Sequence, residues 1–588
     1  MSKNTEKILN VNPLKKALNK CNFAFKITFW FAFVINLLML ITPLYSLQVL
    51  DRVIGSGNLH TLLMLSLIIA SIYFVHALLQ IARSFTFIKI GEWLDNEISP
   101  IIFSNAVSAS AMRGRINSSQ MLRDFQTVKT FLTSAGINTL FDAPWSILYI
   151  AVVFFINKYL GYLCVSGAVI IVLFGLFNAV ATNKTLGEAT EYSIKGMYHA
   201  DIASRNAETV ESMGMIKNIS KHWAKFNKGA LQKQSIASYR NGVLSNFSRF
   251  IRSLLQMAVT GIGAYVVVSS NGQDMTTGNM IASSIIVGKA LAPFDNAIVM
   301  WKTISSSLKS YKQLNLFFDT HKMKEDFMSI NDVQGKLSLD NVFFSFDQNK
   351  NSLAGMLQNT VPKYVLQGVS FSIEPGEALA VIGNSAAGKS TLAKLICGIW
   401  QPYSGTARLD GADVFQWNRE NLGTHLGYLP QNIELFHGTV KENISRMEDS
   451  PDSDEIIRVS KICGAHDMIL SLSEGYDTNI GAGGSNLSGG QRQRIGLARA
   501  FYGKPKLIVL DEPNANLDQI GEEALANAIL EAKKLQITVV IISHRKSILS
   551  VVDKIMILDR GYVMKFASKS EFGNSSAISS NNVLPINH

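Results

Sequence analysis

Two glycine-containing segments, well separated along the chain, have residues that could hold an anion. The first, GNSAAGKST, runs from Gly383 to Thr391 and follows the apolar stretch ALAVI. The second, GGSNLSGGQRQR, runs from Gly483 to Arg494. In both segments small residues leave backbone N–H groups open to approach, and the positive end of the helix expected to follow would attract negative charge. We therefore expect both segments to contact phosphate groups.

The first segment has the spacing G-x-x-x-x-G-K-[ST] of a phosphate loop, with a buried strand expected before it and a helix after it. Lys389 would bridge phosphate oxygens, and the Ser390 hydroxyl would bind Mg²⁺. Alanines occupy two positions where glycine and serine are commoner, but both are small enough for close approach of the backbone. The residues expected to bind the nucleotide here are Gly383, Asn384, Ser385, Ala386, Ala387, Gly388, Lys389, Ser390 and Thr391.

A further apolar run supplies carboxylates for the same site. In KLIVLDEPNANLD, residues Leu507 to Leu510 predict a central strand with Asp511 at its carboxyl end. Asp511 would hold the Mg²⁺ through water, and Glu512 would accept a proton from the water that attacks the γ-phosphate, or orient that water. The alternative, a solvated acidic turn, is disfavoured once the phosphate loop is accepted.

Three single residues could complete the site, although each alone is weak evidence. Gln431, in LGYLPQNIELF, could contact the Mg²⁺ and sense the γ-phosphate. His544, after the strand expected at ITVVIIS, could hydrogen-bond the γ-phosphate and hold the attacking water, and Phe346 could stack on adenine. A lone histidine at a strand end is more often structural, and a lone phenylalanine more often belongs to the core. Their order relative to the two strong motifs favours the functional interpretation.

In that order, the phosphate loop, Gln431, LSGGQ, LDEP, NLD and His544 resemble the nucleotide-binding domain of ATP-binding cassette (ABC) transporters. The resemblance covers about residues 333–572 and implies an ATPase that uses ATP and Mg²⁺. It also accounts for the second anion-holding segment, because in this family two domains meet head to tail and each ATP lies between one phosphate loop and the opposite LSGGQ. A homodimer is therefore expected, in which Ser488, Gly489 and Gly490 of one chain contact the ATP bound by the other. Gln491 and Asp518 are also expected among the nucleotide-binding residues.

The N-terminal half has the composition of a membrane domain. Only 17% of the residues are charged and 47% are hydrophobic, with the apolar excess in this half. The net charge of +11 forms no basic stripe with interleaved aromatics, so it indicates positive flanks of membrane helices rather than nucleic-acid binding. The four cysteines match neither a metal nor a disulfide pattern. Six stretches approach the ~20 residues needed to cross a bilayer: Ile27–Val49, Leu62–Ile81, Ile137–Ile156, Leu160–Val180, Phe250–Ser269 and Met280–Met300.

The basic residues predict the topology of these spans. The links Ala82–Gly136 and Ala181–Arg249 carry many lysines and arginines, which places them and the N-terminus in the cytoplasm. Apolar residues at helical spacing predict that the membrane helices continue into these links. The expected fold is an α-helical membrane bundle of six spans with long cytoplasmic extensions, fused to an α/β P-loop ATPase domain. The expected parts are a cytoplasmic N-terminal segment (1–26), the transmembrane domain (27–326), the nucleotide-binding domain (333–573) and a disordered tail (574–588).

A finer resemblance indicates the ATPases of bacterial type I secretion. LDEPNANLDQIGEEAL is similar to the DEPNSNLDxxGExAL of that group, and SLQVLDRVIGSGNLHTLLML, TLFDAPWSILYIAVVF and GNMIASSIIVGKALAPFDNAI resemble its membrane stretches. The short segment before the first span implies the protease/lipase exporter group, which has no N-terminal peptidase-like domain. The resemblance implies export of proteins with carboxyl-terminal signals across the bacterial inner membrane, with a periplasmic adaptor and an outer-membrane channel as partners. The alternatives are an exporter of lipids, peptides or small molecules, and a regulatory membrane ATPase that transports nothing.

Two positions depart from the pattern of the family. Ala482 stands where GEGG has a glutamate thought to touch the membrane domain, and Ala515 replaces the serine of SNLD. The hydrolytic residues are intact, so these changes predict altered coupling contacts rather than an inactive ATPase.

Charged residues inside the predicted spans have two interpretations. They are costly in lipid and could line a passage for an unfolded acidic cargo. The alternatives are snorkelling at a helix end for the two arginines and an internal ion pair for the lysine. The residues concerned are Asp142, Arg249, Arg252, Lys289 and Asp295.

Overall fold

The computed structural model describes residues 12–113, 118–270, 273–320, 328–346 and 363–573. The chain divides into two units, Met1–Met323 and Lys324–His588, each with its own buried apolar clusters, and the two are described separately. The predicted tail 574–588 and residues 1–11 of the predicted N-terminal segment lie outside the described residues.

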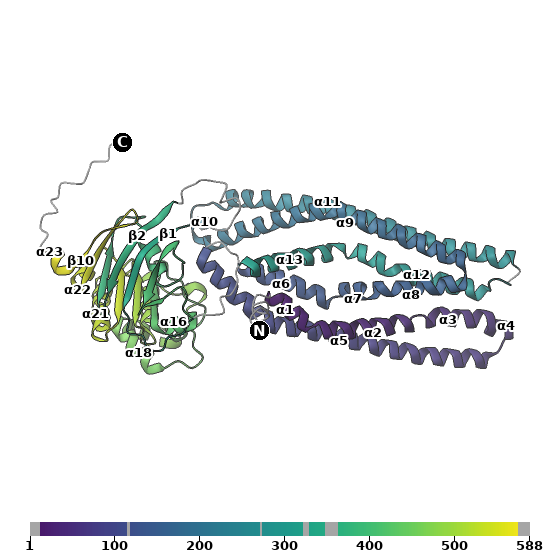
Figure 1. Cartoon of the computed structure of the whole chain (residues 1–588), viewed down its shortest axis with the longest axis horizontal. Coiled ribbons are helices and arrows are strands. Elements are labelled where there is room, and N and C mark those ends of the chain that lie inside the picture. Colours follow the sequence, from purple (N-terminus) through teal and green to yellow (C-terminus); the bar gives the residue numbers. More distant parts are fainter. Residues whose placement is uncertain (1–11, 114–117, 271–272, 321–327, 347–362, 574–588) are drawn as a thin grey trace, which may run out of the picture. The chain divides into compact units, whose positions relative to one another are not determined.

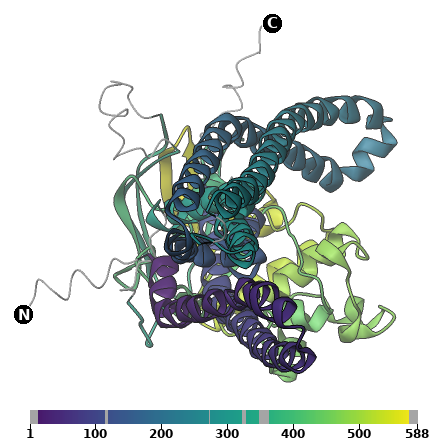
Figure 2. The ribbon, with the colours of Figure 1, turned by 90° about the vertical axis from the view of Figure 1, so that its right-hand side faces the viewer.

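The first unit is a bundle of long helices, which Figure 2 shows nearly end on. Three of them run without interruption: α5 (Leu59–Arg113), α9 (Lys158–Arg205) and α11 (Ile216–Ser269). With its 55 residues, α5 is about 80 Å long, far more than the ~30 Å of a hydrocarbon core. The prediction that membrane helices continue through the basic links is confirmed, and α9 and α11 lie side by side along most of their length (Figure 1).

Shorter helices complete this unit, and two predicted spans are broken. The first consists of α2 (Asn22–Leu38), α3 (Ile41–Gln48), the π turn η1 (Val49–Val53) and α4 (Ile54–Ser56). The third changes from α7 to α8 through a 3₁₀ turn, η2 (Ala143–Trp145), that contains Pro144. The remaining elements are α1 (Pro13–Lys20), α6 (Ser118–Thr133), α7 (Ala135–Asp142), α8 (Ser146–Ile156), α10 (Ala207–Ser212), α12 (Thr277–Val299) and α13 (Trp301–Thr320).

Five helical stretches among the described residues are long and apolar enough to cross a membrane: Asn22–Ser56, Leu59–Met112, Gly136–Ile156, Lys158–Arg205 and Ile216–Ser269. Helix α12, the predicted sixth span, is not among them. It packs against α3, α8, α9 and α11, and it buries small and polar residues such as Ser283 and Asp295. Because such a helix faces protein rather than lipid, its composition can be less apolar. The count of six spans stays a prediction.

Three of the five charged residues singled out in the spans form ion pairs within the bundle. Arg252 of α11 pairs with the buried Asp295 of α12 at 3.1 Å, which corrects the alternative that Arg252 snorkels at a helix end. Asp142 pairs with Arg83 of α5 at 2.9 Å. Lys289 forms no ion pair with any described residue, and its ammonium lies 3.4 Å from the Met39 sulfur, so the internal ion pair considered for it is wrong. Arg249 is exposed, and a passage along these residues stays a prediction.

The second unit contains a parallel and an antiparallel sheet. The six-stranded sheet has the order β10-β9-β3-β8-β7-β6, parallel except for β10. The prediction of a mostly parallel sheet is right for this sheet, but GKLSLDNVFFSF lies in the antiparallel one, of order β2-β1-β4-β5. The strands are β1 (Leu337–Ser345), β2 (Tyr364–Ile373), β3 (Ala378–Ile382), β4 (Ser404–Leu409), β5 (Ala412–Asp413), β6 (Leu426–Leu429), β7 (Leu507–Asp511), β8 (Thr538–Ile542), β9 (Lys554–Asp559) and β10 (Tyr562–Ser568).

The central strands are buried along their whole length because both faces of the sheet are covered. Every residue of β7 and β8 is buried. The described α-helices of this unit are α15 (Lys389–Ile396), α16 (Arg419–His425), α17 (Val440–Ile444), α18 (Ser453–Ile462), α19 (His466–Leu470), α20 (Gly489–Phe501), α21 (Gln519–Lys534), α22 (Lys546–Val551) and α23 (Lys569–Gly573).

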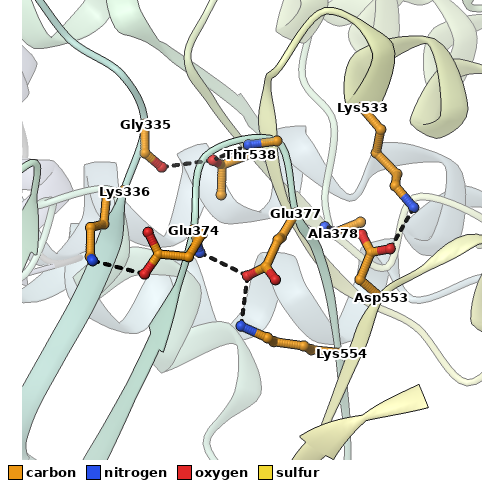
Figure 3. Close-up of polar contacts among 10 residues, drawn as sticks. Gly335, Lys336, Glu374, Glu377, Ala378, Lys533, Thr538, Asp553 and Lys554 are labelled. Carbon is orange, nitrogen blue, oxygen red and sulfur yellow. Dashed lines mark hydrogen bonds and ion pairs between the residues drawn. The ribbon is translucent and has the colours of Figure 1, made fainter. Parts of the chain in front are cut away.

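Polar contacts fasten the amino-terminal edge of the parallel sheet (Figure 3). Thr538, at the start of β8, donates its hydroxyl hydrogen to the Gly335 carbonyl at 2.7 Å. The Glu377 carboxylate accepts from the Lys554 ammonium at 2.6 Å, and the Asp553 carboxylate accepts from the Ala378 N–H at 2.9 Å. These bonds join residues far apart in sequence. They fix the strand starts, so the carboxyl ends of β3, β6, β7 and β8 meet at the opposite edge in a defined register.

Candidate nucleotide site at the carboxyl edge of the parallel sheet

The phosphate loop connects β3 to α15, as its spacing predicts. Its two glycines are required by close approach of the backbone: a Cβ on Gly383 would lie 2.0 Å from the Leu558 carbonyl oxygen, and one on Gly388 2.7 Å from the Leu366 side chain. Gly388 also has φ +101°, a conformation that glycine adopts readily. The Lys389 ammonium donates to the carbonyls of Gly383 and Asn384 at 2.6 and 2.9 Å, which holds the positive charge over the loop.

The alanine pair in the loop has an asymmetry that the sequence does not reveal. Ala386 is exposed and has φ +64°, in the left-handed region, whereas Ala387 is buried and outside that region. A non-glycine residue in this region costs about 1–2 kcal/mol. The extra flexibility of glycine in the unfolded chain costs about 0.4–1 kcal/mol. Glycine is therefore commoner at this position because it adopts the left-handed conformation without this strain.

We expect Ala386→Gly to raise the free energy of unfolding by up to about 1 kcal/mol, since relief of strain exceeds the entropy cost. The adjacent Ala387→Gly should lower it by about 1 kcal/mol, because it removes a buried methyl group without relieving strain. Thermal unfolding of the nucleotide-free protein in detergent measures both. Shifts of the same sign in the two variants would contradict the strain argument.

The end of β7 offers a fitting place for Mg²⁺. The Asp511 carboxylate is 2% exposed, and its Oδ1 atom has no hydrogen-bond partner among the described residues. Burial raises the pKa of Asp511, while the nearby Ser390 hydroxyl and the ammonium groups of Lys394 and Lys389 act in the opposite direction. A buried carboxylate oxygen beside a hydroxyl is the oxygen-rich environment that Mg²⁺ prefers. The residues present therefore fit the predicted roles of Ser390 and Asp511.

Glu512 lies directly after β7 and is held in an unusual backbone conformation. Its φ is +52°, and its N–H donates to the Ile542 carbonyl of β8 at 3.0 Å. The Gln431 side chain, which follows β6, donates to the Glu512 carboxylate at 2.9 Å. Backbone strain of this kind occurs often at functional sites. The structure thus joins two predicted site residues that lie far apart in the sequence.

His544 lies just after β8 at the same edge of the sheet. Its side chain is exposed and makes no hydrogen bond with the described residues. The preceding Ser543 donates its hydroxyl hydrogen to the Asn514 side chain at 2.9 Å, which joins the segment after β8 to the turn after β7. Sequence reasoning did not identify Ser543 and Asn514. Their bond positions His544 relative to Glu512, and the role of His544 at a γ-phosphate stays a prediction.

Phe346 is an exposed ring on an aromatic support. Its side chain is 67% exposed, and its ring meets those of Phe344 and Trp400 edge on, at 5.3 and 5.4 Å between centroids. Phe344 and Trp400 are themselves stacked at 5.1 Å. An aromatic ring that keeps a free face suits stacking on a base, so the predicted contact with adenine remains consistent with the geometry.

The second anion-holding segment forms the start of α20, as predicted. Ser488 caps the helix: its hydroxyl accepts from the Gln491 N–H at 3.2 Å, and its own N–H donates to the Gln491 side chain at 2.8 Å. A Cβ on Gly490 would lie 3.0 Å from the Asn516 carbonyl, and one on Gly489 3.5 Å from the side chain of that asparagine. The LSGGQ segment is therefore packed against the turn that follows β7.

Two further contacts fix α20 at this turn. Gln493, which is buried, donates to the Pro513 carbonyl at 2.6 Å. Arg494 pairs with Asp518 at 2.7 Å, and Asp518 caps α21 by accepting from the Gly521 N–H at 2.9 Å. Sequence reasoning missed Gln493 and Arg494, and the run of polar residues after LSGGQ was the only signal. Asp518 thus has a structural role besides its predicted contact with nucleotide.

The two anion-holding segments stay separate within one chain. In the described ranges, no hydrogen bond or ion pair joins Ser488–Gln491 to Gly383–Thr391. Of the two departures from the family pattern, Ala515 is exposed at the turn after β7, and the side chain of Ala482 lies outside the described part of the chain. Their effect on coupling stays a prediction.

Comparisons with known protein families match both units. The family described as ABC transporter transmembrane region matches residues 25–289, and the family described as ABC transporter matches residues 366–515. A solved structure of a bacterial Atm1-family ABC exporter with ATP bound has the same fold, with a TM-score of 0.79 at 21% sequence identity. The similarity covers 95% of this chain and 97% of that one.

Several curated proteins are similar to this chain over nearly its whole length. The type I secretion system ATP-binding protein PrsD of Rhizobium meliloti (strain 1021) is 34% identical over 568 residues, which cover 96% of this chain and 95% of PrsD. The cyclolysin secretion/processing ATP-binding protein CyaB of Bordetella pertussis is 27% identical, over 91% of this chain and 74% of CyaB. The leukotoxin translocation ATP-binding protein LktB of Mannheimia glucosida is 25% identical, over 92% of this chain and 75% of LktB.

Proposed function

Because the chain belongs to the ABC transporters, and within them to the type I secretion ATP-binding proteins, we propose that it exports unfolded proteins with carboxyl-terminal signals across the bacterial inner membrane. It is an ATPase whose hydrolysis drives export. The observation that carries the proposal is the match to PrsD over nearly the full length of both proteins, because it includes the membrane unit as well as the ATPase unit.

The active form that we propose is a homodimer with two composite ATP sites. Each chain has one phosphate loop and one LSGGQ segment, and among the described residues no hydrogen bond or ion pair joins the two segments. In the dimer, Ser488, Gly489 and Gly490 of one chain would donate to the γ-phosphate of ATP held by Lys389 of the other. The backbone N–H groups of Gly489 and Gly490, at the start of the capped helix α20, suit this role.

The residues at the carboxyl end of β7 account for the hydrolytic step. The Glu512 carboxylate accepts a proton from water as the water oxygen attacks the γ-phosphorus, and the bond to the β-phosphate oxygen breaks to give ADP and phosphate. Gln431 holds this carboxylate in place. Mg²⁺ held near Ser390 and Asp511 would neutralise charge on the phosphate oxygens. Loss of the γ-phosphate removes the attraction between the two nucleotide domains, which then separate.

The expected partners follow from the same family. CyaB and LktB are named for the secretion or translocation of cyclolysin and leukotoxin. We propose that this chain likewise handles a secreted protein and works with a periplasmic adaptor and an outer-membrane channel. The apolar helices place it in the membrane as a multi-pass protein, with the nucleotide domain proposed to face the cytoplasm.

The cargo class can be tested with purified protein. We expect carboxyl-terminal segments of proteins secreted by the same bacterium to raise the rate of ATP hydrolysis severalfold, because bound cargo would favour closure of the composite sites. Amino-terminal segments of the same proteins, matched in length and charge, are the control. Stimulation by lipids or small molecules but by no carboxyl-terminal segment would instead support the alternative exporter. If Glu512→Gln left secretion intact while ATP binding changed the activity of a partner, the chain would be a regulatory ATPase.

A further inference from the structure

The Asp51 carboxylate joins the broken first span to the start of α12. Its Oδ2 atom accepts from the Thr276 hydroxyl, and its Oδ1 atom accepts from the Gly278 N–H at 2.8 Å. Thr276 in turn caps α12 by accepting from the Asn279 N–H at 3.1 Å. A carboxylate at a helix amino terminus is stabilised both by these donors and by the helix dipole. We call Asp51, Thr276 and Gly278 the outer clasp.

The clasp depends on the absence of a side chain at Gly278. A Cβ at this position would lie 2.6 Å from the Cγ and Oδ1 atoms of Asp51, closer than real Cβ contacts allow. Gly278 is buried, and its backbone φ is not in the left-handed region, so conformational freedom does not explain the glycine. Close approach of the carboxylate does explain it.

The part of the chain that carries Asp51 is a separate element. The helix is interrupted at Met39 and Leu40, and the following segment Ile41–Ser56 ends before the left-handed Gly57. Before the interruption α2 packs mainly on α5, whereas α3 after it packs mainly on α12. Asp51 itself lies in the π turn η1, a feature that occurs frequently at functional sites. Residues 41–56, which we call the outer segment, therefore have α12 as their main partner.

We propose that the outer clasp is a positioning device for export: it holds the outer segment against α12 while the passage is closed, and it releases when the cargo leaves. The assignment of this end to the outer face rests on the topology proposed above. Polar contacts suit such a device, because hydrogen bonds near the surface can be exchanged for bonds to water at a small net cost. Asp51 is the positioning residue, and it acts through α12, which also carries Lys289 and Asp295.

Labelling of a cysteine in α12 tests the position of the outer segment. Ala282, six residues after Thr276, is 2% exposed. In the Ala282→Cys variant, we expect the new cysteine to react slowly with a membrane-impermeant maleimide. Adding Asp51→Ala should make this reaction about 10-fold faster, because loss of the charge-assisted hydrogen bonds favours the open position of the outer segment. Thr276→Val should act in the same direction, and combining it with Asp51→Ala should add little, because both changes break one contact. Asp274→Asn, an exposed carboxylate outside the clasp, is the matched control and should leave the rate unchanged.

Export measured per ATP hydrolysed separates positioning from a general structural role. For Asp51→Ala we expect an unchanged KM for ATP and retained hydrolysis, with about 10-fold less cargo exported per ATP. Asp51→Asn keeps one acceptor oxygen and should be intermediate. A proportional fall of hydrolysis and export, or labelling rates that do not respond to Asp51→Ala and Thr276→Val, would overturn the proposal. If only a membrane-permeant maleimide showed the acceleration, the clasp would stand and the topology would be wrong.

Discussion

Replacing Glu512 with glutamine is expected to lower kcat for ATP hydrolysis by about 10²–10⁴-fold, the usual contribution of a general base. The amide has nearly the same shape and can still contact Gln431, but it cannot take the proton from the attacking water. ATP should therefore still bind with unchanged affinity, and export should stop. Phosphate release and nucleotide binding, measured on the same purified protein, give the two quantities.

A matched control separates this effect from a loss of negative charge. Glu474 is exposed and lies outside the site, so Glu474→Gln should leave kcat unchanged. If Glu512→Gln kept more than about a tenth of the native kcat, the loss would be smaller than removal of a general base causes. Another group would then activate the water, and His544 would be the next residue to test.

Mixing two inactive variants is expected to restore ATP hydrolysis. Lys389→Ala removes the ammonium of the phosphate loop, and Ser488→Arg places a bulky cation where α20 would meet the γ-phosphate. Each homodimer then has a defect in both of its composite sites. A mixed dimer places both defects in one site and leaves the other site intact. In a sample that contains only mixed dimers, about half of all sites should therefore be native.

The measurement is the rate of ATP hydrolysis of co-expressed chains that carry different affinity tags and are purified through both tags. Ser485→Arg, an exposed change three residues before Ser488, controls for the added arginine and should be active as a homodimer. No recovery in the doubly purified dimer would mean that each chain completes its own site, and the composite mechanism would have to be abandoned.

The parts of the site that the sequence predicts are those built from adjacent residues. The phosphate loop, the strand ending at Asp511 and the Ser488 cap each depend on a few consecutive side chains, so local rules are sufficient for them. The contacts between Gln431 and Glu512 and between Arg494 and Asp518 join separate segments. They depend on how strands are ordered in the sheet and how a helix is rotated on it, which no local pattern encodes.

In the membrane unit, too, the sequence predicted local features but not the contacts between distant segments. Apolar runs and basic links predicted the long helices, because a helix that crosses lipid and continues into water must change its surface composition at the boundary. The break at Met39 and Leu40 agrees with Pro43, which cannot donate to the carbonyl of Met39, but the partner of Arg252 and the π turn did not follow from composition. Asp295 becomes its partner only through the packing of α11 on α12, and the π turn at Val49–Val53 adds no proline or glycine to mark it.

The paired helices α9 and α11 have a mechanical consequence. Neither contains a proline, and each runs for about 50 residues in contact with the other. A continuous helix of 54 residues is about 80 Å long. Tilting such a rod by roughly 5° moves its far end by roughly 7 Å, by simple lever geometry on that length. The pair can therefore act as a stiff strut that converts a slight rotation at one end into a displacement larger than the diameter of a water molecule at the other.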